Sequence, residues 1–226
     1  MIGANRLSYF GTMKTNEGHF RRTLRQILKV RVPDTQGSKE VRDFIANEMS
    51  NLGWSVEEDA FEQNTVVGNV KFTNVIATLN PNAARRMVIA CHYDSKTTPE
   101  GFLGAIDSAV PCAQMINLAH TMKLDLDDHK ANPDNELTLQ FLFLDGEEAF
   151  IQWTSTDSIY GARHLASKLQ GTDYTYKRVS GNELDRIDIF VLLDLLGAKD
   201  PTIISSQKST DVSKNFLIFS RDIFEK

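Results

Sequence analysis

The chain has 226 residues, of which 41% are apolar and 24% are charged, a composition typical of a globular domain rather than of a disordered or fibrous chain. Its net charge of -5 argues against a nucleic-acid partner, because binding to phosphates needs a basic surface. No apolar run approaches the ~20 residues that a membrane-spanning helix needs, so we expect no membrane span.

Two helices are predicted in the first quarter of the chain. Apolar residues recur there at helical spacing, at Phe20, Leu24, Ile27 and Leu28. A second helix is predicted over Ser38–Leu52, with one apolar face and Gly53 directly after its end. The segment Met1–Phe20 is polar and charged and has no apolar core of a signal peptide, so none is expected in this chain.

Strands and helices alternate along the rest of the chain. Strands are predicted over Val70–Leu79, Met87–Cys91, Leu137–Leu144 and Ile187–Leu193. Helices are predicted over Ser108–Met122, with Pro111 in its first turn, and over Ile159–Leu169. We expect Asp125–Glu136 to be a charged surface loop. Apolar strands that alternate with amphipathic helices predict an α/β fold whose sheet is at least partly parallel and covered on both faces.

Acidic side chains and one histidine follow these strands directly. They are His92, Glu147, Glu148 and Asp194, with Asp107 just before the helix that starts near Ser108. Ligands bind outside the carboxyl ends of the strands in open α/β sheets. Carboxylates gathered there repel one another unless a cation neutralises them, and oxygen and imidazole ligands suit zinc. The sequence therefore predicts a divalent metal site at this edge of the sheet.

Each residue also has a structural interpretation. Asp107 alone fits a helix N-cap, Asp145-Gly146 fits a turn, and His92 alone fits a core residue with satisfied hydrogen bonds. Asp194 is harder to explain structurally, because a carboxylate between pairs of leucines needs a partner. The common position of these residues at strand ends favours the metal site.

The chain has two cysteines, Cys91 and Cys112. The residues alone leave two interpretations open. They are two buried free thiols, or one disulfide that would indicate an oxidising compartment.

Several segments resemble animal glutaminyl cyclases, in the same order along the chain. They are residues 90–96 (ACHYDSK), 104–112 (GAIDSAVPC), 143–150 (FLDGEEAF), Trp153, 157–165 (DSIYGARHL) and 191–198 (VLLDLLGA). The resemblance extends from about Phe20 to Thr202. That family has a zinc exopeptidase-like fold, so the resemblance implies a three-layer α/β domain with a mostly parallel central sheet and helices on both faces.

The resemblance also implies roles for individual residues. Asp107 and Glu148 match zinc ligands, and Glu147 matches the general acid/base. Asp194 matches a residue that assists at the substrate amide, and Trp153 matches a pocket tryptophan. Cys91 and Cys112 match a disulfide pair, and His92 matches a position that binds metal in two-zinc aminopeptidases but not in single-zinc cyclases.

The implied enzyme is a glutaminyl-peptide cyclotransferase that uses one zinc ion. It converts the N-terminal Gln of peptides or proteins to pyroglutamate and releases ammonia. The resemblance also implies the secretory pathway, and we expect the protein to be a monomer.

This chain departs from the family pattern at its C-terminal end. The family's third zinc ligand is a histidine near the end of its chain, and no residue here matches it. The resemblance fades after Thr202, so we expect residues 203–226 to be a divergent tail and the chain to lack the C-terminal part of the family domain. We therefore expect weak zinc binding and poor cyclisation unless His92 or a water replaces that ligand.

Two other functions fit the same residues. A two-zinc aminopeptidase would use His92, Asp107, Glu148 and Asp194 as its ligands. A fragment without catalytic activity would at most bind peptides or partner proteins.

Overall fold

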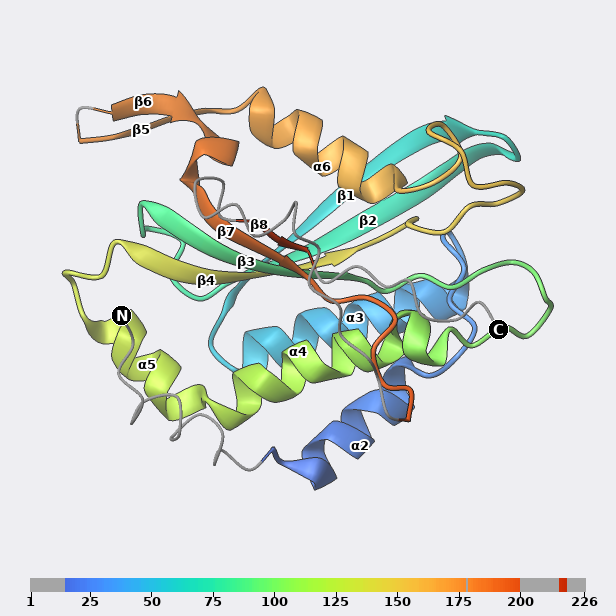
Figure 1. Ribbon diagram of the computed structural model, residues 1–226, viewed down its shortest axis with the longest axis horizontal. Coiled ribbons are helices and arrows are strands. Elements are labelled where there is room, and N and C mark those ends of the chain that lie inside the picture. Colours follow the sequence, from blue (N-terminus) through green and yellow to red (C-terminus); the bar gives the residue numbers. More distant parts are fainter. Residues whose placement is uncertain (1–14, 178, 200–215, 219–226) are drawn as a thin grey trace.

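The computed structural model describes residues 15–177, 179–199 and 216–218, so most of the divergent tail expected over residues 203–226 lies outside it. The described residues form a six-stranded sheet in the order β1-β2-β4-β3-β7-β8 (Figure 1). Its strands are β1 (Ser55–Thr65), β2 (Gly68–Thr78), β3 (Arg85–His92), β4 (Leu137–Leu144), β7 (Ile187–Leu192) and β8 (Phe216–Ile218). The centre is parallel, because β3 pairs parallel with both β4 and β7, whereas β1 and β2 pair antiparallel.

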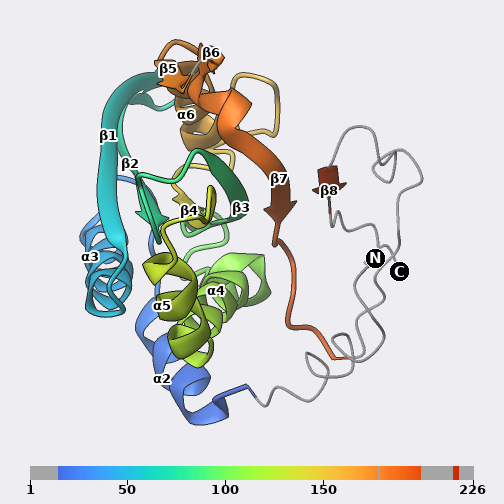
Figure 2. The same ribbon diagram turned by 90° about the vertical axis from the view of Figure 1, so that its left-hand side faces the viewer.

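Helices cover both faces of this sheet, which confirms the predicted three-layer α/β fold. On one face lie α2 (Glu17–Ile27), α3 (Gln36–Asn51), α4 (Val110–Thr121) and α5 (Lys123–Ala131), and on the other lies α6 (Tyr160–Gln170), as Figures 1 and 2 show. A smaller hairpin of β5 (Asp173–Tyr176) and β6 (Val179–Asn182) follows α6. No helix in the described part of the chain is long and apolar enough to cross a membrane.

The two core regions follow from the alternation of side chains along each strand. Ile89 and Cys91 of β3 lie in the cluster that includes α3 and α4, whereas Val88 and Ala90 lie in the cluster that includes α6. All four are buried, so β3 is apolar on both faces, as its continuous apolar sequence predicted. Full burial of one large aliphatic side chain contributes about 1.5–3 kcal/mol to stability.

The local sequence explains where the helices begin. Thr35 caps α3, since its side chain accepts a hydrogen bond from the backbone N–H of Ser38, and Gly53 follows the helix at a positive φ of 88°. Pro111 lies in the first turn of α4, as predicted, where its missing N–H leaves no helical bond unmade.

One prediction about the elements needs correction, and one long strand was missed. The expected loop over Asp125–Glu136 is wrong for its first half, because α5 covers Lys123–Ala131. Leu126 is buried and Lys123 pairs with Asp127 one turn later, at 2.6 Å, so one apolar anchor and local ion pairs support a charged helix. The strand β1 was not predicted.

Candidate metal centre

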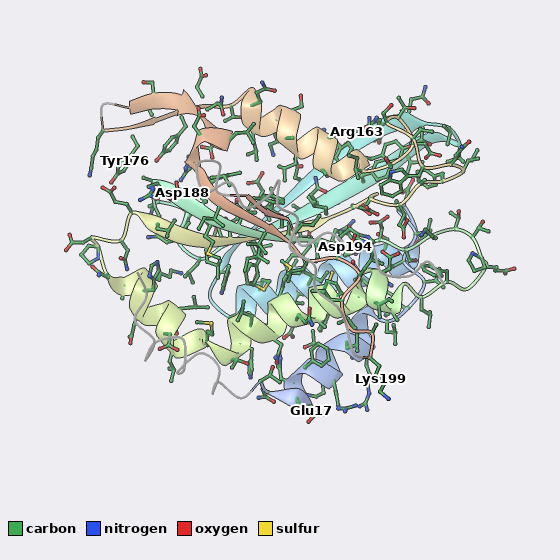
Figure 3. The ribbon with its side chains drawn as sticks, viewed as in Figure 1. Glu17, Arg163, Tyr176, Asp188, Asp194 and Lys199 are labelled. Carbon is green, nitrogen blue, oxygen red and sulfur yellow. The ribbon has the colours of Figure 1, made fainter. Side chains whose placement is uncertain are left out.

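The carboxyl ends of β3, β4 and β7 meet at one edge of the sheet. In the parallel ladder His92 pairs with Leu144, and Ala90 pairs with Leu192, so the three strands end almost level. The residues after them are therefore brought together, and Figure 3 labels Asp194 where the chain leaves β7.

His92 lies at the centre of the resulting acid cluster and is almost fully buried. Its Nε2 lies 2.9 Å from Oδ1 of Asp107, and its Nδ1 lies 3.2 Å from Oδ1 of Asp94. Nε2 is also 3.7 Å from Oδ1 of Asp194 and 3.9 Å from Oε2 of Glu147. The predicted convergence of His92, Asp107, Glu147 and Asp194 is thus present in the structure.

The protonation of His92 follows from these contacts. Burial by itself lowers the pKa of His92, but hydrogen bonds with Asp107, Asp194 and Asp94 outweigh it and raise the pKa well above the ordinary value. A carboxylate accepts hydrogen bonds and cannot donate them. Carboxylate partners at both ring nitrogens therefore favour the protonated imidazole.

Asp94 fixes the loop that carries the two glutamates, a role that the sequence did not indicate. Its carboxylate accepts hydrogen bonds from the backbone N–H groups of Glu147 and Glu148, both at 3.1 Å. Burial opposes its ionisation, but the hydrogen bond with His92 and the two backbone donors lower its pKa. Asp94 is therefore a buried anion that joins the end of β3 to the loop after β4.

Asp107 and Asp194 both have contacts within the acid cluster. The N-cap of α4 is Ala109, without a side-chain cap, so the alternative that Asp107 caps this helix is wrong. Asp107 lies in the irregular turn η1 (Ala105–Ala109), with non-helical φ and ψ of -127° and 77°. Asp194 has the partner that its leucine surroundings required, because Ser108 Oγ donates to its Oδ1 at 2.7 Å.

The donor set fits a metal ion. One ligand atom each from His92, Asp107 and Glu148 lie within 4.8 Å of one another. Oε1 of Glu148 is buried and has no hydrogen-bond partner, which leaves it available to a cation. One imidazole nitrogen and two carboxylate oxygens are ligands that zinc accepts. The residue pattern alone left open whether His92 is a metal ligand or a core residue. In the structure it completes a set of three donors.

The two glutamates differ in exposure and in surroundings. Burial, with the charge of Asp94 nearby, raises the pKa of Glu147 to about 8, although His92 opposes the shift. Burial, with the charge of Asp107, raises the pKa of Glu148 to about 7. Lys96 partly balances the negative charge, since its Nζ lies 3.3 Å from Oε2 of Glu148 and 3.8 Å from Oδ2 of Asp107.

Trp153 lies on the loop that follows Glu148 and is 56% exposed, so the described residues do not enclose it in a tight pocket. Asp157 organises this loop. Its carboxylate accepts the backbone N–H groups of Phe150, Ile151 and Gln152 at 2.9–3.0 Å. The loop conformation that presents Trp153 therefore depends on one buried carboxylate.

The sulfur atoms of Cys91 and Cys112 lie 2.9 Å apart and are both buried. A disulfide bond is about 2.05 Å long, so the structure holds two neighbouring thiols. The disulfide stays a prediction.

The chain is similar to known proteins of one family. The model of "Peptidase family M28" matches residues 74–221. A glutaminyl-peptide cyclotransferase of Drosophila melanogaster is 46% identical over 195 residues, which are 85% of this chain and 52% of the fly protein. One of Bos taurus is 45% identical over 187 residues, 79% of this chain and 52% of the bovine protein. The chain spans about half the length of these curated relatives.

Solved structures show the same relationship. The crystal structure of Macrostomum lignano glutaminyl cyclase matches with a TM-score of 0.78 and 42% identity, over 88% of this chain and 59% of that one. A Zn-dependent exopeptidase from Parabacteroides distasonis matches with a TM-score of 0.67 at 20% identity, over 87% of this chain and 67% of that one, and so shares the fold.

Proposed function

Because the chain belongs to peptidase family M28, we propose that it is a zinc-dependent glutaminyl-peptide cyclotransferase. Its substrates are peptides or proteins with an N-terminal glutamine. The observation that carries the proposal is the position of Glu147, a partly buried carboxyl group. Its Oε2 lies 3.9 Å from Nε2 of His92, which forms a group of candidate metal ligands with Asp107 and Glu148.

The reaction joins two groups of one residue. The α-amine attacks the γ-carboxamide carbon, a C–N bond closes the five-membered ring, and the C–N bond to the leaving amide nitrogen breaks to release ammonia. His92, Asp107 and Glu148 would hold a zinc ion, which would supply Lewis-acid polarisation of the amide oxygen. We propose that this site holds a single ion.

Glu147 is proposed as the general acid/base. Its carboxylate takes a proton from the attacking amine and returns it to the departing nitrogen. Burial raises the pKa of Glu147, and a carboxyl group that titrates close to the working pH can both accept and return a proton. Asp194, fixed by the hydroxyl of Ser108, is proposed to hold the substrate amide. Trp153 is proposed to contact the glutamine side chain.

The same cluster offers a second candidate function. Nε2 of His92 lies 3.7 Å from Asp194, so His92, Asp107, Glu148 and Asp194 also form the donor set expected of a two-zinc aminopeptidase. This alternative predicts hydrolysis, in which a free amino acid leaves the peptide.

One experiment separates the two functions. The full chain, loaded with zinc, is incubated with a Gln-initiated peptide and with an Ala-initiated peptide of the same sequence otherwise. The proposal predicts ammonia release from the Gln peptide and no free amino acid from either. Free alanine or glutamine would instead establish the aminopeptidase, and neither product in the presence of bound zinc would identify a form without catalytic activity.

Two further statements are part of the proposal. We infer that residues 1–226 act as one catalytic domain and that the protein works as a monomer in the secretory pathway. The neighbouring thiols of Cys91 and Cys112 support the compartment, because such a pair forms a disulfide readily where conditions are oxidising.

A further inference from the structure

Arg31 is the largest of the fully buried side chains among the described residues, with no exposed surface. It lies in the short segment between α2 and α3, far in sequence from the acid cluster. An arginine is almost never buried completely without partners, because its charge must be compensated. Its contacts therefore show what the buried charge is for.

The guanidinium group donates to backbone carbonyls on both sides of the metal centre. Nε donates to the carbonyl of Tyr93, Nη1 to those of Lys29 and Leu103, and Nη2 to that of Gly104, at 2.9 Å. Tyr93 lies between His92 and Asp94, and Gly104 leads into the turn that carries Asp107. One planar side chain thus joins the two segments that supply the nitrogen ligand and the first oxygen ligand.

The backbone of Arg31 is fixed to the same segment. Its N–H donates to Ser95 Oγ at 3.0 Å, and the N–H of Ser95 donates to the carbonyl of Arg31 at 3.3 Å. Gly104 also fits tightly here. A Cβ at this position would lie 2.3 Å from the carbonyl oxygen of Asp107 and 3.0 Å from Nη2 of Arg31. The guanidinium group and the turn before Asp107 are therefore in direct contact.

The charge of Arg31 has no carboxylate among its described hydrogen-bond partners, so it is compensated at longer range. Burial lowers the pKa of Arg31, and the negative charges of Asp94 and Asp107 act in the opposite direction. The acid cluster and the buried cation therefore stabilise each other. An arginine stays protonated throughout the accessible pH range.

We propose that Arg31 is a positioning residue that preorganises the metal centre, by holding His92 and Asp107 at the separation that a bound zinc ion requires. The inference rests on the metal site of the proposed function. Outer residues that orient metal ligands typically change metal affinity by about 10–100-fold when they are replaced. A lysine cannot substitute, because it offers one nitrogen in place of a fork that reaches both segments.

A merely structural arginine provides the matched control. Arg186 is also buried and also donates to backbone carbonyls, from Nε to Ala84 at 3.1 Å and from Nη2 to Pro81 and Ala83. It lies just before β7, at the opposite end of the strands from the acid cluster, and it pairs with Glu183. Its replacement should lower stability without changing the positions of the metal ligands.

The experiment measures the zinc dissociation constant of the full chain by competition with a chromophoric chelator, together with the melting temperature. Arg31→Lys is expected to weaken zinc binding by about 10–100-fold, whereas Arg186→Lys is expected to stay within about twofold of the unmodified chain. Equal affinities for Arg31→Lys and the unmodified chain, or equal losses in both variants, would overturn the inference. If the unmodified chain binds no zinc, the proposed function fails together with the inference. If the unmodified chain binds zinc and Arg31→Lys binds it equally well, only the inference fails.

A milder pair of variants covers the case in which Arg31→Lys does not fold. Ser95→Ala removes the hydroxyl that accepts the Arg31 N–H, and Thr138→Val removes a buried hydroxyl that accepts the N–H of Asn80 at the far end of the sheet. Weaker zinc binding in Ser95→Ala alone supports the positioning role. Unchanged binding in Ser95→Ala contradicts it.

Discussion

Nε2 of His92 lies 2.9 Å from Oδ1 of Asp107, so the end of β3 and the turn before α4 meet in one hydrogen bond. The same two residues are among the three that form the candidate metal centre. A bound cation would replace the shared proton between them, since metal ligands bind in their deprotonated forms.

Replacement of His92 by glutamine is expected to weaken zinc binding by more than about a hundredfold, because a first ligand contributes more than the outer residues whose loss gives 10–100-fold. Equilibrium dialysis with zinc measures the change. His19→Gln is the matched control, because His19 is also a buried histidine, hydrogen-bonded to Asn117 away from the cluster. Unchanged affinity in His92→Gln would remove His92 from the ligand set.

Zinc affinity is expected to fall with decreasing pH. The acids around His92 hold its pKa well above the ordinary value, so the imidazole must lose a proton before it can bind the metal. Glu148, whose pKa is raised to about 7, must be deprotonated as well, so each unit of pH should change the affinity by about tenfold for each proton that binding releases. Calorimetric titrations in buffers of different ionisation enthalpy count the released protons. A zinc affinity that does not vary between pH 6 and 8 would contradict the release of ligand protons on zinc binding.

Glu147→Gln is expected to lower kcat for cyclisation by about 10²–10⁴-fold, the usual contribution of a general acid/base. Zinc affinity should change little, because Glu147 is not one of the three grouped donors. Ammonia release from a Gln-initiated peptide gives the rate. Glu62→Gln, on the exposed part of β1, is the control and should retain full activity. A fully active Glu147→Gln variant would assign the proton transfer to another group.

Asp157→Asn is expected to raise KM more than it changes kcat. Its carboxylate holds three consecutive N–H groups of the loop that presents Trp153, and the amide cannot accept all of them. Loss of hydrogen bonds to a charged group should lower stability by about 1.5–3 kcal/mol. Asp185→Asn, which loosens a comparable cap beside the β5–β6 hairpin, should lower stability without changing KM. Equal KM values in both variants would show that the loop that carries Trp153 does not contribute to substrate binding.

Asp59 is expected to make the stability of the protein depend on pH in the acidic range. Burial opposes its ionisation, but hydrogen bonds from Lys168 and Asn74 outweigh it and lower the pKa of Asp59. Its stabilising effect is therefore complete above the unfolded pKa of about 3.9 and is lost as pH falls through the lower folded value. Urea unfolding between pH 2 and 7 measures it. Asp59→Asn should reduce the loss of unfolding free energy at low pH, and Asp43→Asn on the surface of α3 should not.

The central sheet and its helices were predictable because their side chains are patterned. Continuous apolar runs gave β3, β4 and β7, and helical spacing gave α3, α4 and α6 within a few residues. The edge strand β1 was missed because most of its side chains are polar and only Asp59 is buried. Its identity as a strand comes from its ladder with β2, a tertiary contact that the local sequence does not contain.

The acid cluster was predictable from the rule that ligands bind at strand ends, but the residues that position it were not. Asp94 gave one signal, since it follows His92 by two residues and so lies near it in an extended segment. Arg31 gave another, as a charged residue between two valines. Neither signal names the carbonyls and N–H groups that these side chains bind, because backbone partners leave no mark in a sequence.

The position of β1 affects how copies of the chain meet at high concentration. Figure 2 shows it at an outer border of the sheet, where unpaired backbone groups can add a strand from a second molecule. Glu57, Glu58 and Glu62 are exposed along it and pair with Lys168, Arg42 and Lys71, so this border carries charged side chains of both signs. Charged side chains on a border strand oppose the addition of a second strand, so self-association through β1 is disfavoured.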